Sequence, residues 1–556
     1  MKLTGAQIIA ECLLEQEVDT VFGYPGGAVL NIYDALYQYS GRIRHILTAH
    51  EQGASHAADG YARATGKVGV VIATSGPGAT NLVTGIATAY MDSVPLVAIT
   101  GNVNVDLLGR DSFQEVDIQG ITMPVTKHNF IVKNIQDLAP VMRKAFRVAT
   151  SGRKGPVLID VPKDITAQQA EFTHMALQSP PEPAAPDESA LRYAAEMLAQ
   201  SQRPLVYAGG GILASGASEQ LRLFAEQLDI PVTCSVMGLG GFPASHPLYI
   251  GNIGMHGRYE TAMATEHSDL IVVAGARFSD RVAGNRERFG ANAKMIHLDI
   301  DPAEINKNVR VAHSVVGDLA QVLRRLCQLS AAMKHDEWRA QIAAWKNEGT
   351  AGAERGGCLP DPFHVISAIR SLCGAQDIVA TDVGQHQMWT AQCYRFEQPR
   401  TFLTSGGLGT MGFGLGAAIG AQVAFPDRRV TLISGDGSFH MNLNELTTLA
   451  SYELPVVVVV MNNQVLGMVR QWQKLFYGRR FSQTDPHRKT DFVKLAQAFG
   501  VEGLRIERDD EVEAVLRHAY AMHRPVVVDC RISPDENVLP MIPPGGTANQ
   551  MIMDME

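Results

Sequence analysis

The sequence predicts an α/β protein that contains three doubly wound parallel sheets. Short runs rich in β-branched residues alternate with stretches of helical periodicity along the chain. Its 556 residues are enough for about three to four domains of ordinary size. The 46% hydrophobic content supports large cores, and 52 glycines with only 7% aromatic residues favour a fold with many tight turns.

The β-branched runs that we expect to form strands lie in all three parts of the chain. They are residues 68–73, 96–100 and 157–161, then 205–208, 270–274 and 295–300, then 378–381, 430–434, 456–461 and 526–530. Helical stretches separate them, so the strands are expected to be parallel. In such sheets ligands bind in the loops that follow the strands, and the chemistry is expected there.

Two stretches interrupt the alternation and are typical of linkers between domains. Residues 166–190 contain a proline-rich run at 179–183, and residues 347–362 contain paired glycines and two prolines. We therefore predict an N-terminal domain at 1–165, a central domain at 190–346 and a C-terminal domain at 360–545.

Charge and cysteine content limit the classes of function. The 48 Lys and Arg against 57 Asp and Glu give a net charge of −9, and there is no basic tail, so nucleic acid is not an expected partner. No apolar run reaches the roughly 20 residues that span a bilayer, and no export signal is visible. Seven scattered cysteines without a Cys-x-x-Cys pair favour a reducing environment, so we expect a soluble cytoplasmic enzyme.

Two polar segments follow neighbouring expected strands in the C-terminal part. Gly435-Asp436-Gly437 follows residues 430–434, and Asn462-Asn463 follows residues 456–461. The interval fits one crossover helix, which would place the carboxylate of Asp436 and the amide oxygen of Asn463 at the same sheet edge. Both are hard oxygen ligands that suit Mg²⁺ beside a diphosphate. Gly-Asp-Gly by itself is also common in tight turns.

The pairing of these two segments resembles the signature of thiamine-diphosphate-dependent enzymes. The resemblance implies that Asp436, Asn463 and the backbone carbonyl of Val465 hold the metal that anchors the diphosphate. It also implies a glutamate in the N-terminal domain that activates the aminopyrimidine ring. Glu51, in Ala-His-Glu-Gln-Gly-Ala, matches that position. Without the metal motif, Glu51 would read as an ordinary, partly exposed helix acid.

Further motifs extend the resemblance over nearly the whole chain. They are FGYPGG at 22–27, ATSGPGATN at 73–81, FQEVD at 113–117, DVGQHQMW at 382–389, SGGLGTMG at 405–412 and GMVRQW at 467–472. Together they are similar to the biosynthetic catalytic subunits of acetohydroxyacid synthases, with isozyme II as the nearest type.

This resemblance implies a specific reaction. Pyruvate would be decarboxylated on thiamine diphosphate, and the enamine would add to a second pyruvate or to 2-ketobutyrate. The products would be 2-acetolactate or 2-aceto-2-hydroxybutyrate, precursors of valine, leucine and isoleucine. The alternatives are a flavin-dependent pyruvate oxidase and a catabolic acetolactate synthase, whereas a catalytically silent binding subunit is disfavoured because Glu51, Asp436 and Asn463 are all present.

The resemblance assigns further residues. The diphosphate and the aminopyrimidine would be contacted by Val383, Gln385, His386, Gly409, Met411, Gly437 and Ser438. Substrate-side roles fall to Phe113, Gln114, Lys163, Arg277 and Trp472. Taken alone, Met411 could fill core, Trp472 could be a buried anchor, and Lys163 could be a surface lysine after a strand.

The central part carries glycines and acids after its expected strands, which suits a dinucleotide, although no Gly-x-Gly-x-x-Gly begins it. On residues alone, a dinucleotide and a purely structural layer are equally good interpretations. The resemblance implies FAD. Its expected contacts are Arg153, Gly210, Gly211, His256, Gly275, Arg277, Arg281, Asp299, Ile300 and Asp318.

Glu51 and Asp436 belong to different domains, so each active site is expected to form at a domain interface. The resemblance places the two residues in different subunits, implying a homodimer or homotetramer, and suggests a small regulatory subunit. Two departures from the family pattern are Asn252, where an apolar residue is frequent, and Gly416, where proline is frequent. We expect Asn252 to alter local packing and Gly416 to loosen the start of a helix.

Overall fold

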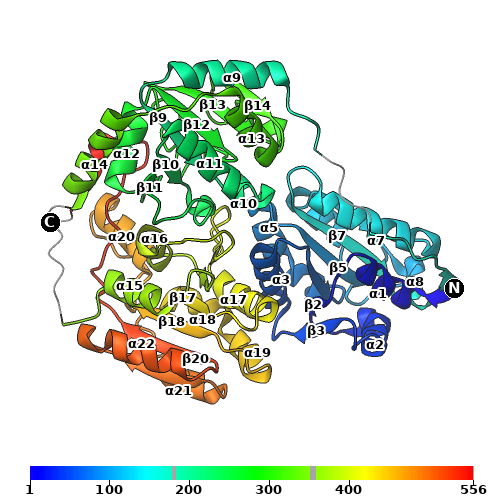
Figure 1. Ribbon diagram of the computed structural model, residues 1–556. Helices are drawn as coiled ribbons and strands as arrows, with labels where there is room; N and C mark the ends of the chain where they lie inside the picture. The colour runs from blue at the N-terminus through cyan, green and yellow to red at the C-terminus, as the bar shows by residue number, and fades with distance from the viewer. Residues whose placement is uncertain (178–182, 351–357, 555–556) are drawn as a thin grey trace.

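The computed structural model describes residues 1–177, 183–350 and 358–554. Three six-stranded sheets, each wholly parallel, form three α/β units that follow one another along the chain (Figure 1). We call them the N-terminal, middle and C-terminal units. The predicted fold class is therefore confirmed. Much of the predicted proline-rich run and the paired glycines of the second predicted linker lie outside the described residues.

The N-terminal sheet has its strands in the order β3-β2-β4-β5-β7-β6. Their bounds are Arg44–Leu47, Thr20–Gly23, Gly69–Ala73, Leu96–Asn102, Pro156–Pro162 and His128–Ile131. Alternate side chains of β4 point to opposite faces, as a strand requires. Val70 and Ile72 pack on one face with α1 (Gly5–Glu15) and α7 (Ile135–Thr150). Val71 and Ala73 pack on the other with α3 (Glu51–Thr65) and α5 (Val83–Asp92).

Short antiparallel strands β1 (Lys2–Thr4) and β8 (Gln169–Glu171) form a separate two-stranded sheet. Ala170 and Phe172 belong to the same core as α1 and α7, so this segment closes the N-terminal unit.

The middle sheet has the order β11-β10-β9-β12-β13-β14. The strands are Tyr249–Asn252, Val232–Cys234, Pro204–Ala208, Leu270–Ala274, Lys294–Asp299 and His313–Val316. Helices α9 (Glu188–Gln200), α11 (Ser218–Leu228) and α13 (Leu319–Leu329) share a core with one face, and α12 (Tyr259–His267) and α14 (Asp336–Thr350) with the other. Counted within this unit, the order is 3-2-1-4-5-6, the arrangement of dinucleotide-binding folds.

The C-terminal sheet has the order β16-β15-β17-β18-β20-β19. The strands are Phe402–Leu403, Ile378–Thr381, Val430–Gly435, Val457–Asn462, Val526–Arg531 and Glu502–Ile506. Its pattern of crossovers is the same as that of the N-terminal sheet. Helices α15 (Pro362–Leu372), α16 (Gln385–Cys393) and α22 (Val512–Ala521) pack on one face, and α17 (Phe413–Ala424) on the other.

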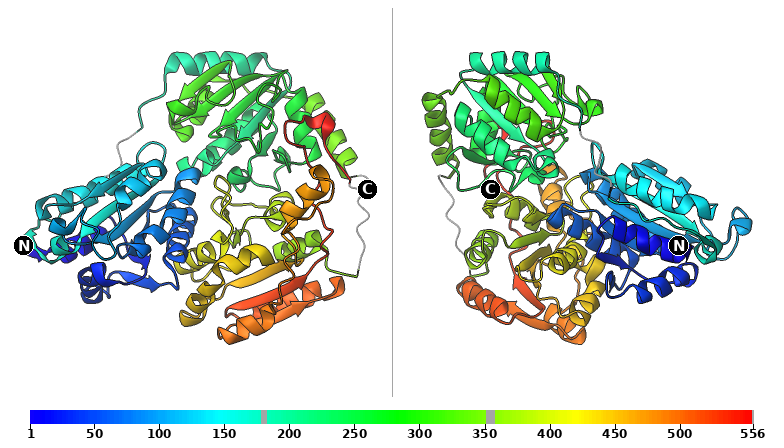
Figure 2. Two further views of the ribbon diagram at one scale, coloured as in Figure 1. Left: turned by 180° about the vertical axis from the view of Figure 1, so that it is seen from behind. Right: turned by 45° about the vertical axis from the view of Figure 1, so that its right-hand side comes forward.

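Helices α3 and α17 join the N-terminal and C-terminal units and lie side by side in Figures 1 and 2. Glycines allow this close approach. A Cβ on Gly420 would lie 1.9 Å from the carbonyl oxygen of Ala57, and one on Gly416 would lie 2.7 Å from the Cβ of His56. The glycine at 416 is thus required by the helix contact. It lies in the first turn of α17, which begins at Phe413 and is continuous through this position, and the loosening of that turn stays a prediction.

The segment after β20 leaves the C-terminal unit and contacts the middle one. The backbone N–H of Ile542 donates to the carbonyl of Met255 at 2.8 Å. Asn285 donates through its side-chain amide to the carbonyl of Gly545 at 3.0 Å. Within the described chain, no helix combines the length and apolar character that crossing a membrane demands.

Candidate active site

Asp436 and Asn463 follow two neighbouring strands at the same sheet edge. Gly435, at the end of β17, pairs with Met461 of β18, so Asp436 and Asn463 come within two residues of one paired position. Asp436 begins the short helix α18 (Asp436–Asn442), and both side chains are buried. The structure therefore brings together the two residues that the spacing placed at one edge.

The Asp436 carboxylate has no salt bridge among the described residues, and its hydrogen bonds come from the backbone N–H groups of Asp436 and Gly437. Burial raises its pKa to about 7, and the charge of Arg488 offsets this only in part. The side-chain amide of Asn463 makes two hydrogen bonds. Its NH₂ group donates to Gln385 Oε1 at 3.2 Å, and its oxygen accepts from the backbone N–H of Val465 at 3.2 Å. A divalent cation would supply the missing positive charge. Across the described ranges no three His, Cys, Asp or Glu side chains cluster as metal ligands, so the candidate donors are one carboxylate, one amide and one carbonyl, a set of oxygens that suits Mg²⁺.

The loop after β15 faces this edge from the adjoining strand. Gly384 has φ 155°, and a Cβ on Gly435 would lie 2.8 Å from His386 Nδ1, so the two loops pack closely. The His386 ring is buried, which lowers its pKa to about 3 and keeps it neutral. Its Nε2 has no hydrogen-bond partner among the described residues. A buried, neutral, unpartnered ring nitrogen is suited to a polar ligand at this point.

Residues 404–412, which we call the glycine loop, lead from β16 into α17. Gly409 has φ 71°, and a Cβ there would have only Val383 Cγ1 nearby, at 3.9 Å, so its surroundings are open. A Cβ on Gly437 would lie 3.8 Å from Met411 Cε, which places Met411 beside the start of α18.

Two side chains of the C-terminal unit fix the end of the glycine loop. Asp382 Oδ1 accepts the N–H groups of Gly412 and Gly414, each at 2.9 Å, and its Oδ2 accepts from the Ser434 hydroxyl at 2.6 Å. Asn442 donates to the carbonyl of Gly412 at 2.7 Å. We did not assign Asp382 or Asn442 from the sequence. The position of Asp382 directly after a strand was the available signal.

A cavity of about 1580 Å³ opens between the three units. Its walls include Val383, Gly409 and Met411 of the C-terminal unit and Trp472 on α20 (Gly467–Phe476). Every residue predicted to contact FAD also lines it: Arg153, Gly210, Gly211, His256, Gly275, Arg277, Arg281, Asp299, Ile300 and Asp318. The cavity is larger than the roughly 300–1,000 Å³ of most small-molecule pockets, so it has room for more than one ligand.

The reversal point of the middle sheet, where its strand order reverses between β9 and β12, lies at this cavity. The loops after β9 and β12, where the strand order reverses, lie in contact. A Cβ on Gly211 would be 2.6 Å from the Cα of Gly275, so neither position tolerates a side chain. Three buried polar atoms of residues in the cavity wall, Asn252 Oδ1, His256 Nδ1 and Glu304 Oε2, have no hydrogen-bond partner among the described residues. These atoms and the strand order fit a dinucleotide.

Several of the predicted FAD contacts already have protein partners. Arg153 reaches from the N-terminal unit to Glu304 at 2.7 Å and to Asp301 at 3.3 Å. Asp318 caps α13 through the N–H of Gln321 at 3.1 Å. Arg281 lies over the Trp472 ring, with its Cζ 5.8 Å from the ring centroid.

Glu51 is the first residue of α3 and is not among the residues that line the cavity. Its Oε2 accepts from the Asn81 side chain at 3.0 Å, and its Oε1 lies near Gly78. Gln114 approaches the same loop, since a Cβ on Gly76 would be 2.8 Å from the Gln114 carbonyl. Phe113 is 87% exposed, and Lys163 is also exposed. Of the predicted catalytic residues, Arg277 and Trp472 line the cavity, whereas Glu51, Phe113, Gln114 and Lys163 do not. The predicted metal ligands Asp436 and Asn463 are not part of its wall either.

A carboxylate of the C-terminal unit holds the segment before Glu51. Glu445 is fully buried and accepts the N–H groups of Ala49 at 3.1 Å and His50 at 3.0 Å. A Cβ on Gly53 would collide with it at 2.0 Å. Sequence reasoning missed Glu445, because nothing in its local pattern points to a partner almost 400 residues away.

Comparison with known proteins assigns each unit to a family model. Residues 3–121 match the thiamine pyrophosphate enzyme N-terminal TPP binding domain, residues 191–326 the central domain, and residues 382–530 the C-terminal TPP binding domain. Thiamine pyrophosphate is the same compound as thiamine diphosphate.

Named relatives match over almost the full length. The chain is 44% identical to the acetolactate synthase large subunit of Haemophilus influenzae, over 99% of this chain and 98% of the relative. It is 45% identical to the acetolactate synthase isozyme 3 large subunit of Escherichia coli over the same shares. It is 46% identical to the acetolactate synthase large subunit of Parasynechococcus marenigrum, over 99% of this chain and 91% of the relative.

Proposed function

Because this chain belongs to the acetolactate synthase large subunits, within the thiamine diphosphate enzymes, we propose that it forms 2-acetolactate or 2-aceto-2-hydroxybutyrate in branched-chain amino acid biosynthesis. The observation that carries the proposal is the buried carboxylate of Asp436, without a salt bridge among the described residues, beside Asn463 at one sheet edge. A metal-bound diphosphate suits this edge.

Thiamine diphosphate supplies, when bound, the nucleophilic carbon that a decarboxylating carboligase requires. Asp436, Asn463 and the carbonyl of Val465 would hold Mg²⁺. Gln385, His386, Gly437 and Ser438 would contact the diphosphate, and Val383, Gly409 and Met411 the aminopyrimidine. What supports these roles is the shared sheet edge, the neutral His386 ring and the open space at Gly409.

Glu51 would exchange a proton with the aminopyrimidine ring. The side chain of Glu51 accepts its hydrogen bond from Asn81 of its own unit, and no hydrogen bond in the described chain links it to the residues proposed for the aminopyrimidine. This supports a site that two chains build together, with Glu51, Phe113, Gln114 and Lys163 supplied by a second copy. We therefore propose a homodimer or a larger homo-oligomer such as a tetramer. The division at 1–165, 190–346 and 360–545 remains our proposal for the domains.

We propose that FAD occupies the part of the cavity beside the reversal point of the middle sheet. The strand order, the Gly211–Gly275 contact and the unpartnered atoms of Asn252 and His256 support it. Arg277 and Trp472 would meet the acceptor keto acid, the arginine through its carboxylate and the tryptophan through its alkyl group. A small regulatory subunit is a further expected partner, since the relatives are named large subunits, and the cytoplasm is the proposed location.

The test is the product profile of the purified protein with pyruvate, thiamine diphosphate, Mg²⁺ and FAD, with and without 2-ketobutyrate, omitting each cofactor in turn. We expect acetohydroxyacids, and no product without thiamine diphosphate or Mg²⁺. Acetate formed with flavin reduction would instead identify a pyruvate oxidase. Full activity in flavin-free protein would contradict the FAD proposal and indicate the catabolic type.

A further inference from the structure

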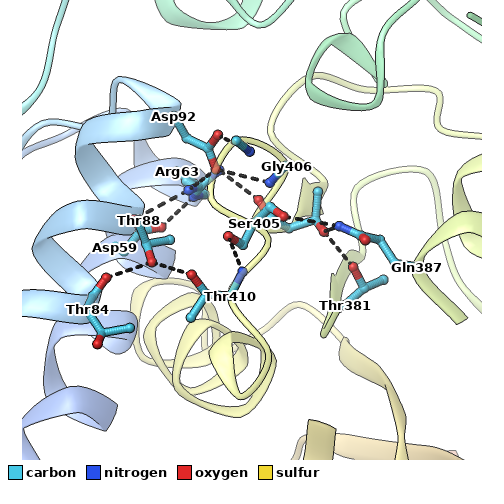
Figure 3. Close-up of polar contacts among 12 residues, drawn as sticks. Asp59, Arg63, Thr84, Thr88, Asp92, Thr381, Gln387, Ser405, Gly406 and Thr410 are labelled. Carbon is cyan, nitrogen blue, oxygen red and sulfur yellow. Dashed lines mark hydrogen bonds and ion pairs between the residues drawn. The ribbon is translucent and has the colours of Figure 1, made fainter. Parts of the chain in front are cut away.

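The glycine loop is held from two sides. Asp382 and Asn442 hold its end from within the C-terminal unit, as described above. On its other side it contacts the N-terminal unit of the same chain, through side chains of α3 and α5 (Figure 3). Those contacts are polar and buried, although the N-terminal and C-terminal units meet elsewhere mainly through apolar packing.

The centre of these contacts is the guanidinium of Arg63. It pairs with both oxygens of Asp59, one turn earlier on α3, and with Asp92 Oδ2 at 2.9 Å. It also donates to the carbonyl of Thr404, the first residue of the glycine loop, at 2.9 Å. Burial alone would lower the pKa of Arg63, but the charges of Asp59 and Asp92 outweigh it and the net shift is upward.

Asp92 ends helix α5 and touches the glycine loop directly. Its Oδ1 accepts the N–H of Gly407 at 2.7 Å, and its Oδ2 accepts the N–H of Gly406 at 3.2 Å. The approach is so close that a Cβ on Gly407 would lie 2.6 Å from Asp92 Oδ1. Two consecutive amides therefore fix the backbone of the glycine loop two residues before Gly409.

Thr88, one turn earlier on α5, makes a second contact with the same loop. Its hydroxyl lies 2.7 Å from that of Thr410, between Gly409 and Met411, and also donates to the carbonyl of Thr84 (Figure 3). The N–H of Thr410 in turn donates to the Ser405 hydroxyl at 3.0 Å. Both anchors thus come from one helix and bracket Gly409.

The charges in this cluster do not balance. Two buried carboxylates, Asp59 and Asp92, surround one guanidinium, whose single charge can offset only one of theirs. The loop amides at Gly406 and Gly407 stabilise the second negative charge. Charge-assisted hydrogen bonds of this kind are about twice as strong as neutral ones, so they set the loop backbone firmly.

We infer that helix α5, through Asp92 and Thr88, positions the glycine loop so that Gly409 and Met411 meet the aminopyrimidine end of the cofactor. Asp92 and Thr88 are positioning residues, since they act through the loop. The inference rests on the proposed function, which places the aminopyrimidine at Gly409 and Met411. It adds that the N-terminal unit of a chain shapes the cofactor site of that same chain.

The inference predicts a selective effect on binding. In the proposed site, Asp436, Asn463 and Gln385 hold the diphosphate end. No hydrogen bond in the described part of the chain links these residues to α5. In Asp92→Asn the NH₂ group faces a loop N–H in either orientation, that of Gly407 in one and that of Gly406, together with Arg63, in the other. We expect the Kd for thiamine diphosphate with Mg²⁺ to rise about tenfold, as for the loss of a charged hydrogen bond. The Kd for inorganic pyrophosphate with Mg²⁺ should change less than twofold.

Calorimetric titration of the full-length protein with these two ligands measures both constants without turnover. The matched control is Asp59→Asn, which removes a carboxylate from the same guanidinium but touches no loop amide. A merely structural cluster would make the two variants alike. Equal weakening of both ligands in Asp92→Asn, no weakening of either, or the same result in Asp59→Asn would overturn the inference.

Thr88→Val and Thr88→Ser decide the matter if Asp92→Asn does not fold. Valine keeps the shape and loses the bond to Thr410, so thiamine diphosphate should bind severalfold more weakly, while serine restores the hydroxyl and the affinity. Valine and serine variants with the same affinity would count against a positioning role. Failure of the proposed function is distinguishable, because the unaltered protein would then not bind thiamine diphosphate.

Discussion

The carboxylate of Glu445 accepts the backbone N–H of His50 across 3.0 Å, one residue before Glu51. It binds the N–H of Ala49 as well, so a side chain of the C-terminal unit sets the start of α3. The position of Glu51 therefore depends on a residue 394 positions further along the chain.

We predict that Glu445→Gln lowers kcat about tenfold, because one of the two N–H groups then faces an NH₂ group and loses its acceptor. The KM for pyruvate should change little, since Glu445 does not line the cavity. Steady-state kinetics measures both. Glu453→Gln, at an exposed glutamate nearby, is the control, and an equal loss of kcat there would contradict the prediction.

Glu51→Gln should keep the fold and the binding of thiamine diphosphate but lose most turnover. The amide cannot exchange the proton that a carboxylate exchanges, and general acid–base groups contribute about 10²–10⁴-fold. Circular dichroism, cofactor titration and initial rates separate the three properties. Turnover within a few fold of the unaltered enzyme would rule out the role of Glu51.

Asp436→Asn should make cofactor binding much weaker, because a neutral amide replaces the only carboxylate among the candidate metal ligands. We expect the Kd for Mg²⁺ in the presence of thiamine diphosphate to rise about 10–100-fold, as for altered metal ligand shells. Asp535→Asn, at an exposed position of the same unit, serves as the control. Removal of Mg²⁺ by EDTA should release the cofactor from the unaltered protein, and retention of it would argue against this metal site.

Trp472→Leu should shift the products towards 2-acetolactate when pyruvate and 2-ketobutyrate compete. A packed methylene accounts for about 1–3 kcal/mol. The ratio of 2-aceto-2-hydroxybutyrate to 2-acetolactate should therefore fall by about 5–150-fold, while kcat changes little. The control is Phe476→Leu, which alters the aromatic neighbour of Trp472; the two ring centroids lie 5.5 Å apart. An unchanged ratio in Trp472→Leu would assign selectivity to another residue.

Asp160 predicts a pH dependence of stability in the N-terminal unit. Burial raises its pKa from 3.8 to about 7, although hydrogen bonds from Asn102 and Thr100 oppose the shift and Asp117 adds to it. Between pH 4 and 7 the folded state holds a proton that the unfolded chain has released. The contribution of Asp160 to the free energy of unfolding is therefore largest below about pH 4. It falls as the pH rises towards about 7, by about 4 kcal/mol at most.

Asp160→Asn removes this titration. Its thermal unfolding midpoint should fall less between pH 5 and pH 8 than that of the unaltered protein. Asp106→Asn, at an exposed carboxylate of the same unit, should follow the unaltered protein. Parallel curves for the unaltered protein and Asp160→Asn would show that Asp160 does not titrate in this range.

The fold class was predictable because the central strands have a distinct composition. β18 is a nearly pure valine run buried on both faces, and β12 and β17 are similar, so each reads as a parallel strand. We missed short or mixed strands such as β3, which contains an arginine and a histidine, and β16, which has only two residues. Those strands depend on pairing with a neighbour rather than on their own pattern.

The candidate site also has residues that could be predicted from the sequence and residues that could not. Asp436 and Asn463 follow recognisable strands, so their spacing was sufficient to place them together. Asp92, Asp382 and Glu445 were missed because each accepts backbone N–H groups from another segment. A contact of this kind leaves no periodicity or spacing in the sequence, since the partner amide belongs to any residue type.

The position of Glu51 and Asp436 in different units has a genetic consequence. If a second chain supplies Glu51, a mixture of chains carrying Glu51→Gln with chains carrying Asp436→Asn assembles hybrids in which one site receives both defects and the other receives neither. Two inactive proteins would then regain activity on mixing and dissociation, approaching a quarter of normal at equal amounts if pairing is random. Two recessive alleles of the gene would complement each other in one cell.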